Sequence, residues 1–299
     1  MFKELLALSF QTSEILRVDI ESGKTTPLEI KTGPCPDGIV VIDDTVYWTT
    51  MGEVPKAKEG QDTTLLKFKA KDGQVRAAPL AGNEVTDITP VGKFTTGKQL
   101  VTDRNGNLYF SDREGYKVFT VHTDGSDLTE LVANNPADGD YAECVGCGVD
   151  TENGYLYWTQ KGPGNGGGKI LRANLEIPKG ETAANRSDIE VIWDKLPEPI
   201  DIEIYDGYLY WTDRGHGIGG NSVNRAPLPA KGETGVKPEI LADGFEDTIG
   251  LAIDEEAGII YAADLGGNIR AVAIPGKSEA KDRLVTKHTG MITGITGLK

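Results

Sequence analysis

The sequence predicts an all-β protein folded as a six-bladed β-propeller, in which a C-terminal strand joins the N-terminal blade and closes the ring. Three observations support this prediction. A short aromatic phrase recurs along the 299-residue chain, 38 Gly and 15 Pro divide the chain into short segments, and the C-terminal residues supply a strand that the first repeat lacks. Turn residues at this density favour short strands over helices.

The recurring phrase is clearest at residues 209–213, which read Leu-Tyr-Trp-Thr-Asp. Its second aromatic position falls at residues 48, 110, 158, 211 and, as alanine, 262, giving spacings of 62, 48, 53 and 51 residues. A recurring period of about fifty residues is typical of repeat proteins. Alternating apolar residues followed by Thr or Ser and a turn predict a strand in each copy. A unit of this size cannot bury its own apolar face, so the units must stack.

Each repeat is expected to contribute four strands. The incomplete first repeat gives strands at 4–10, 15–20 and 26–30. The later repeats give strands at 39–42, 46–49, 65–70 and 75–80; 98–103, 108–112, 117–122 and 128–133; 144–150, 155–160, 169–175 and 189–193; 200–204, 209–213, 223–228 and 239–241; and 250–254, 259–264, 268–274 and 283–287. Residues 51–63 form an insertion, which we expect to be a polar surface loop.

The tail from Met291 resembles the first strand of a repeat, and the first repeat lacks that strand. Pairing of the two ends would close the ring and remove its open sheet edges. Residues 1–299 are therefore expected to form a single propeller domain.

The net charge of −15 argues against nucleic acid or an anionic membrane surface as a partner, because both need a basic footprint. A small-molecule ligand and a monomer or weak dimer are expected instead. The chain has no transmembrane run, and its N-terminal apolar stretch is too short for a secretory signal, so a cytoplasmic location is predicted. The cysteines, Cys35, Cys144 and Cys147, are too few for a disulfide framework and are expected to be buried thiols.

The phrase at 210–213 resembles the YWTD β-propellers known from lipoprotein-receptor ectodomains. Longer strings, such as Cys-Val-Gly-Cys-Gly-Val-Asp at 144–150 and Leu-Pro-Glu-Pro-Ile-Asp at 196–201, resemble a family of stand-alone microbial propellers that is common in fungi. That family includes hetero-Diels–Alderases of tropolone–sesquiterpenoid biosynthesis, so the resemblance implies a cofactor-free small-molecule enzyme. The loop at 214–220 departs from the family's acidic, proline-containing turn, which predicts a different ligand-facing surface.

The innermost strands of a propeller line its central channel, and ligands usually meet the end where those strands begin. Counting back from the aromatic phrases places Glu143, Glu198 and Asp247 at the same level of this mouth, in blades four to six. A register error of one residue would turn a side chain away. Three converging carboxylates predict either a general acid or a site for a hard cation such as Ca²⁺. Alternatively, they cap strand-start amides or pair with neighbouring Arg and Lys.

Other polar residues are expected in the same loops. The candidate catalytic residues are Glu143, Glu198, His216 and Lys161, and the candidate substrate-binding residues are Asp37, Arg113, Arg214 and Asp247. The cations among them follow the aromatic phrases and could orient an anionic or enolic oxygen, and the histidine can change charge near neutral pH. The Asp of each phrase is expected to bind loop amides or an arginine of the adjacent blade, and its Tyr and Trp to pack between blades.

Three functions remain open. The first is a cofactor-free small-molecule enzyme, most concretely a cyclase of the hetero-Diels–Alderase kind, which works by orientation and electrostatics. The second is a non-catalytic propeller that binds a ligand or a protein. The third is a metal-dependent lactonase-like hydrolase with Glu143, Glu198 and Asp247 as ligands. The asparagine-glycine signatures of such lactonases are absent, and the nearest match is Pro36-Asp37-Gly38. No cofactor is expected, with Ca²⁺ as the alternative.

Overall fold

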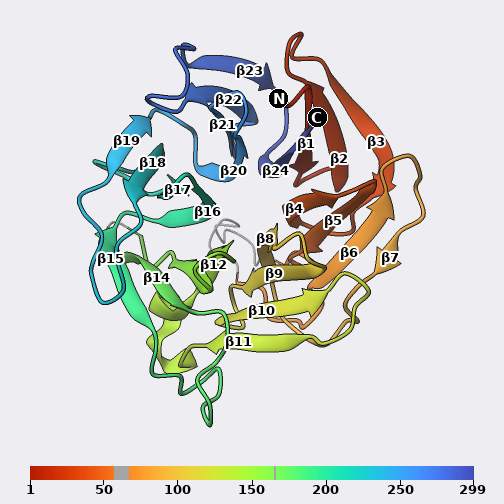
Figure 1. Ribbon diagram of the computed structural model, residues 1–299. Coiled ribbons are helices and arrows are strands. Elements are labelled where there is room, and N and C mark those ends of the chain that lie inside the picture. Colours follow the sequence, from red (N-terminus) through yellow and green to blue (C-terminus); the bar gives the residue numbers. More distant parts are fainter. Residues whose placement is uncertain (57–66, 165) are drawn as a thin grey trace.

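A computed structural model describes residues 1–56, 67–164 and 166–299. Six four-stranded antiparallel sheets surround a central channel (Figure 1). The all-β, six-bladed propeller predicted from the sequence is confirmed. None of the helices in the described residues has the length and hydropathy needed to cross a lipid bilayer.

The first three blades are built as follows, from the channel outwards. Blade one contains β24 (Ile292–Leu298), β1 (Glu4–Ser9), β2 (Glu14–Asp19) and β3 (Thr25–Lys31). Blade two contains β4 (Pro36–Ile42), β5 (Thr45–Thr50), β6 (Gln74–Pro79) and β7 (Thr86–Asp87). Blade three contains β8 (Gly97–Thr102), β9 (Asn107–Asp112), β10 (Lys117–His122) and β11 (Thr129–Ala133).

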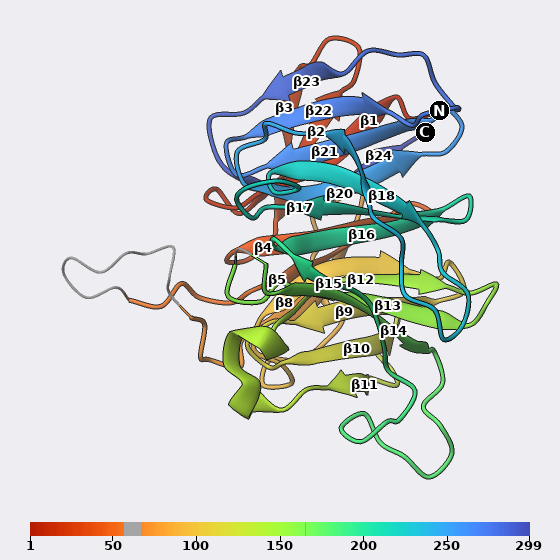
Figure 2. The ribbon, with the colours of Figure 1, turned by 90° about the vertical axis from the view of Figure 1, so that its left-hand side faces the viewer.

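The remaining blades follow the same order. Blade four contains β12 (Cys144–Asp150), β13 (Tyr155–Gln160), β14 (Gly168–Asn174) and β15 (Glu190–Leu196). Blade five contains β16 (Pro199–Tyr205), β17 (Tyr208–Asp213), β18 (Ser222–Pro227) and β19 (Glu239–Ala242). Blade six contains β20 (Thr248–Asp254), β21 (Ile259–Asp264), β22 (Asn268–Ala273) and β23 (Arg283–Lys287). The 3₁₀ helix η2 (Pro136–Ala142) precedes β12 and lies at the left-hand face in Figure 2.

The C-terminal strand closes the ring as predicted. β24 pairs antiparallel with β1 from Glu4 opposite Leu298 to Ser9 opposite Ile292. Figure 1 places both termini in this blade. Strand sharing therefore replaces the missing inner strand of blade one.

The predicted strand at 65–70 is wrong for residues 67–70, and residues 65 and 66 lie outside the described part of the chain. The third strand of blade two is β6, and its fourth is the two-residue β7. Phe68 is buried against Cys35 and Met51. The apolar alternation that suggested a strand therefore reflects a loop packed onto the propeller. Of the predicted surface insertion, residues 57–63 lie outside the described residues.

In blades two to five, the hydroxyl of the aromatic phrase joins the blade to the next one. Thr159 Oγ1 accepts a hydrogen bond from Gly146 N at 2.7 Å and donates to Ile200 O of the following blade at 2.8 Å. Thr49 Oγ1 does the same between Gly38 N, at 2.9 Å, and Lys98 O, at 2.6 Å. Each hydroxyl therefore satisfies groups of two neighbouring inner strands, which explains why Thr or Ser follows the aromatic pair.

The Asp of the phrase holds the start of its own blade's inner strand. Asp213 accepts hydrogen bonds from the amides of Glu198 and Gly215, both at 2.9 Å. Asp112 and Asp264 likewise accept loop amides. The prediction that these carboxylates bind loop amides is confirmed. Because Glu198 is one of the residues held, the phrase also positions the channel mouth.

Candidate functional site

Glu143 lies at the channel mouth between η2 and β12, with its side chain 1% exposed. Its carboxylate forms an ion pair with Lys67, and its Oε2 lies 3.0 Å from the ammonium of Lys161. Lys161 directly follows β13, the strand that carries the aromatic phrase of blade four. Because β13 pairs with β12, Lys161 lies close to Glu143 at the start of β12. A buried carboxylate is thus shared by two ammonium groups.

Glu198 extends this arrangement into blade five. Lys161 Nζ lies 3.6 Å from Glu198 Oε1, which also accepts hydrogen bonds from Arg214 Nη2 at 2.6 Å and Nε at 3.1 Å. We call Lys67, Glu143, Lys161, Glu198 and Arg214 the mouth network. It contains three cations and two carboxylates, and the exposed carboxylate of Asp140 lies 3.1 Å from Lys67 as a further partner. Its ammonium and guanidinium groups are donors that can bind an anionic or strongly polarised oxygen.

Arg113 and Asp37 lie in ion pairs beside the mouth network. The guanidinium of Arg113 donates to Glu114 Oε1 at 2.6 and 3.0 Å and stands 5.8 Å from the ring centre of Phe68. Asp37 is paired with Lys98, and both side chains are buried. After the larger effects of burial and Glu114, the charges of Glu143 and Asp37 also raise the pKa of Arg113.

Burial and charge act against each other in these pairs. Burial alone would lower the pKa of Arg113, but the Glu114 carboxylate reverses this and raises that pKa. Burial lowers the pKa of Lys98 although Asp37 opposes the shift. Burial also raises the pKa of Asp213 to about 7 despite its amide donors. The mouth therefore holds charges that are poorly solvated by water and depend on their partners.

The Lys98–Asp37 pair provides a test of this dependence. Lys98→Met is expected to lower the free energy of unfolding by about 3–5 kcal/mol, because Asp37 is left buried without its partner. Urea unfolding would measure the loss, and the double variant Lys98→Met/Asp37→Asn should lose less than the sum of the single changes.

Lys117→Met is the matched control, since Lys117 pairs with Glu130 at the surface and that pair contributes less than about 1 kcal/mol. Equal losses for Lys98→Met and Lys117→Met would contradict the buried-pair explanation.

Two further residues predicted for the site lie outside both the mouth network and the ion pairs beside it. Asp247 is exposed, has a φ of 59°, and takes part in none of the ion pairs found in the described ranges. The expected ring of three carboxylates is therefore reduced to Glu143 and Glu198. His216 is exposed on the 214–220 loop and makes no side-chain hydrogen bond within the described part of the chain.

Sequence reasoning missed Lys67, Lys98 and Glu114. Lys98 and Asp37 each stand one residue before the glycine-like position of their inner strand, so the same register that located Glu143 could have located this pair. Lys67 belongs to a connection that has no counterpart in other repeats, and no sequence pattern marks it.

The mouth residues do not fit a metal centre. No three His, Cys, Asp or Glu side chains are grouped to hold an ion in residues 1–56, 67–164 and 166–299. The oxygens of Glu143 and Glu198 face ammonium and guanidinium groups, which occupy the positions that a cation would take.

No profile of a known protein family matches the chain. Over 279 residues it is 39% identical to a protein of Pyricularia oryzae named low-density lipoprotein receptor-related protein 1, covering 87% of this chain and 84% of that protein. The chain belongs to this fungal family. It is also 38% identical to the 3-hydroxyacyl-CoA dehydrogenase-like protein LAM1 of Cochliobolus heterostrophus, over 87% of this chain but only 55% of the length of LAM1.

Solved structures show the same fold at low identity. A chain of a nidogen–laminin complex superimposes with a TM-score of 0.69 and 16% identity, covering 98% of this chain and 97% of that chain. A putative 6-phosphogluconolactonase of Bacteroides uniformis gives a TM-score of 0.57 and 12% identity, covering 94% and 82% of the two chains. At these identities, the two structures show that this chain shares the propeller fold with them.

Proposed function

We propose that this protein binds a small organic molecule at the mouth network and acts on it as an enzyme without an organic cofactor. The observation that carries the proposal is the buried Glu143 carboxylate, shared by Lys67 and Lys161 and linked through Lys161 to Glu198. Such groups are fixed before a ligand arrives, and so they can stabilise charge that develops during a reaction.

The most concrete form of the proposal is a cyclase of the hetero-Diels–Alderase kind. In that reaction a heterodiene and an alkene form one carbon–carbon and one carbon–oxygen bond, with no atom lost and no oxidant consumed. The protein needs to hold the two partners together and to polarise the heterodiene oxygen. Lys161 and Arg214 are the donors that we assign to that oxygen, with Glu143 and Glu198 fixing their positions. The resemblance of residues 144–150 and 196–201 to a family with such members supports this choice.

A non-catalytic binding propeller is the second candidate. The relative named after a lipoprotein receptor and the chain of a nidogen–laminin complex favour it. A lactonase-like hydrolase has less support, because the carboxylates that would hold its metal are paired with cations.

The test uses purified protein with a tropolone-derived heterodiene and a sesquiterpene alkene. Glu143→Gln and Glu198→Gln are each expected to lower kcat by about 10²-fold, because each change releases a cation from its fixed position. Cycloadduct formation and its stereochemical excess over the uncatalysed reaction are the measurements.

Asp247→Asn is the control, since it makes the same chemical change on an exposed carboxylate outside the mouth network. Unchanged rates in both Glu variants would refute the role of the mouth network. Saturable binding of the heterodiene with no rate enhancement would favour the binding propeller.

A further inference from the structure

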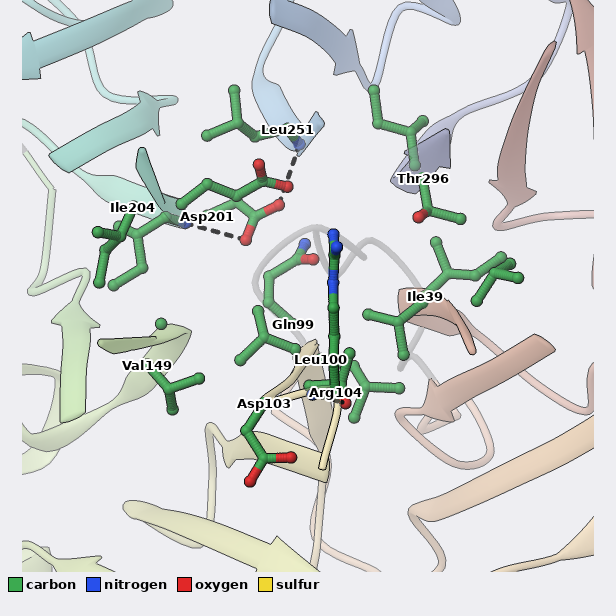
Figure 3. A pocket seen from close by; sticks show the side chains of 18 of the residues that line it. Ile39, Gln99, Leu100, Asp103, Arg104, Val149, Asp201, Ile204, Leu251 and Thr296 are labelled. Atoms are coloured by element: carbon green, nitrogen blue, oxygen red, sulfur yellow. Dashed lines mark hydrogen bonds between the residues drawn. The ribbon is translucent and has the colours of Figure 1, made fainter. Parts of the chain in front are cut away.

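The channel contains a cavity at the end opposite the mouth network. It has a volume of about 380 Å³ and is lined by residues of the inner strands β4, β8, β12, β16, β20 and β24 and of the turns that follow β8, β12 and β20. Figure 3 shows side chains from several blades around this space. The cavity plays no part in the function proposed above.

Two polar side chains stand at a level of the channel where the other inner strands have glycine. Four blades have glycine there, at 38, 146, 250 and 294. A Cβ at Gly146 would lie 2.0 Å from Ile200 O, so the inner strands approach too closely for a side chain. Blades three and five instead carry Gln99 and Asp201 at this level. Gln99 and Asp201, the two residues that replace the glycine of the other inner strands, both line the same cavity.

Asp201 is buried without a cation. Its side-chain oxygens accept hydrogen bonds from Ile202 N at 2.9 Å and Leu251 N at 3.0 Å, and it forms no ion pair with any described residue. Burial, followed by the charge of Glu203, raises the pKa of Asp201 well above its ordinary value. Glu203 lines the same cavity, and burial raises its pKa to about 8.

Gln99 is the second, independent sign of a ligand. The residue is 2% exposed, and its Nε2 has no hydrogen-bond partner within the described part of the chain. An unpaired buried donor costs about 1–3 kcal/mol, so such groups usually have an acceptor that completes them. In Figure 3 the amide of Gln99 points toward the centre of the cavity, on the side of Asp201.

The charges of the lining favour a cation. The ionisable side chains around the cavity are Asp103, Arg104, Asp201, Glu203 and Glu255. Arg104 is the one cation among these lining residues, and its charge acts on Glu203. A ligand with a positive charge would pair with the carboxylates, and an oxygen on that ligand would accept the free N–H of Gln99.

We propose that this cavity binds a small primary amine that carries a neighbouring hydroxyl or carbonyl oxygen, with the ammonium at Asp201 and Glu203 and the oxygen at Gln99. Ethanolamine is the simplest probe of this chemistry. n-Propylamine keeps the charge but replaces the hydroxyl by a methyl group, and glycolate keeps the hydroxyl but reverses the charge.

Isothermal titration calorimetry of the full chain tests the proposal. Ethanolamine should bind saturably, n-propylamine more weakly by several-fold, and glycolate not at all. Asp201→Asn should weaken ethanolamine binding by about tenfold or more, because a charged hydrogen bond is lost. The single Asn oxygen can accept only one of the two amides that the separate oxygens of Asp201 bind, so circular dichroism is used to check that the variant folds. Glu203→Gln gives the same readout if Asp201→Asn does not fold.

The pH dependence follows from the raised pKa of Glu203. Below pH 8 this carboxyl is largely protonated in the empty cavity, and an ammonium favours its ionised form. Binding should therefore release a proton, and affinity should fall as pH falls from 8, by up to about tenfold per unit for each linked proton. Asp201, whose pKa is also raised by burial, can release a second proton when the ammonium binds. Titrations in two buffers of different ionisation enthalpy measure the proton directly on the unaltered protein. Of the other charged groups that line the cavity, Arg104 and Glu255 are exposed, and Asp103 accepts a hydrogen bond from the amide of Asn105. The more distant Asp37 is paired with Lys98.

Arg104→Gln is the matched control variant, which removes a positive charge from the cavity and should change the affinity for ethanolamine in the opposite direction to Asp201→Asn. Arg104 is exposed, so the fold should persist, and loss of a competing cation should tighten ethanolamine binding. The absence of saturable ethanolamine binding would overturn the proposal. Equal affinity of the protein and its Asp201→Asn variant, or binding without proton release, would do the same.

Discussion

A chain ending at residue 290, which lacks β24, is expected to lose its cooperative unfolding transition. β24 supplies the inner strand of blade one, where Ile292 and Ile295 are 1% and 4% exposed. Losing two such side chains costs about 4–10 kcal/mol at the usual cost of truncating a buried Ile to Ala. The hydrogen bonds between β24 and β1 are lost as well. The sum is comparable to the whole stability of a typical domain, about 5–15 kcal/mol.

Circular dichroism during urea unfolding would measure this effect. A chain ending at 298 is the control, because it removes only the exposed Lys299. A synthetic peptide of residues 291–299, added in trans, should restore the transition if strand pairing is the cause. A truncated chain with an unchanged unfolding midpoint would show that the ring does not need its shared strand.

Trp211→Ala is expected to lower the free energy of unfolding by about 3–5 kcal/mol, the usual cost of removing a buried Trp. Trp211 is 1% exposed, and its ring lies 5.5 Å from that of Trp193 in the apolar cluster between blades four and five. The cavity left behind cannot close, because rigid strands hold its walls apart.

Trp211→Phe should lose less than Trp211→Ala, since the phenyl ring fills part of the space. Urea unfolding of both variants gives the comparison. The copy of the phrase in blade six provides an internal reference, because Ala262 occupies the corresponding position and is fully buried. A loss below 1 kcal/mol for Trp211→Ala would contradict the view that the aromatic pair holds the blades together.

Part of the mouth could be predicted by counting along one strand. Glu143 and Glu198 stand at equivalent places before β12 and β16, and the cations Lys161 and Arg214 directly follow the phrases of the same blades. The structure joins these four groups by ion pairs. Asp247 has the same position in the repeat, yet its local backbone leaves the residue exposed. The position of a residue in the repeat therefore predicts where its Cα lies in the blade, but it does not predict which group its side chain contacts.

The sequence by itself determined the propeller fold, the number of blades and the closing strand, because each of these follows from a local period repeated along the chain. Only the tertiary structure decided the pairing of Lys67 with Glu143, the isolation of Asp247, and the meeting of Gln99 with Asp201 in one cavity. Lys67 and Glu143 are 76 positions apart in the sequence, and Gln99 and Asp201 are 102 positions apart. Contacts over such separations depend on how blades close around the channel, and no local pattern encodes that geometry.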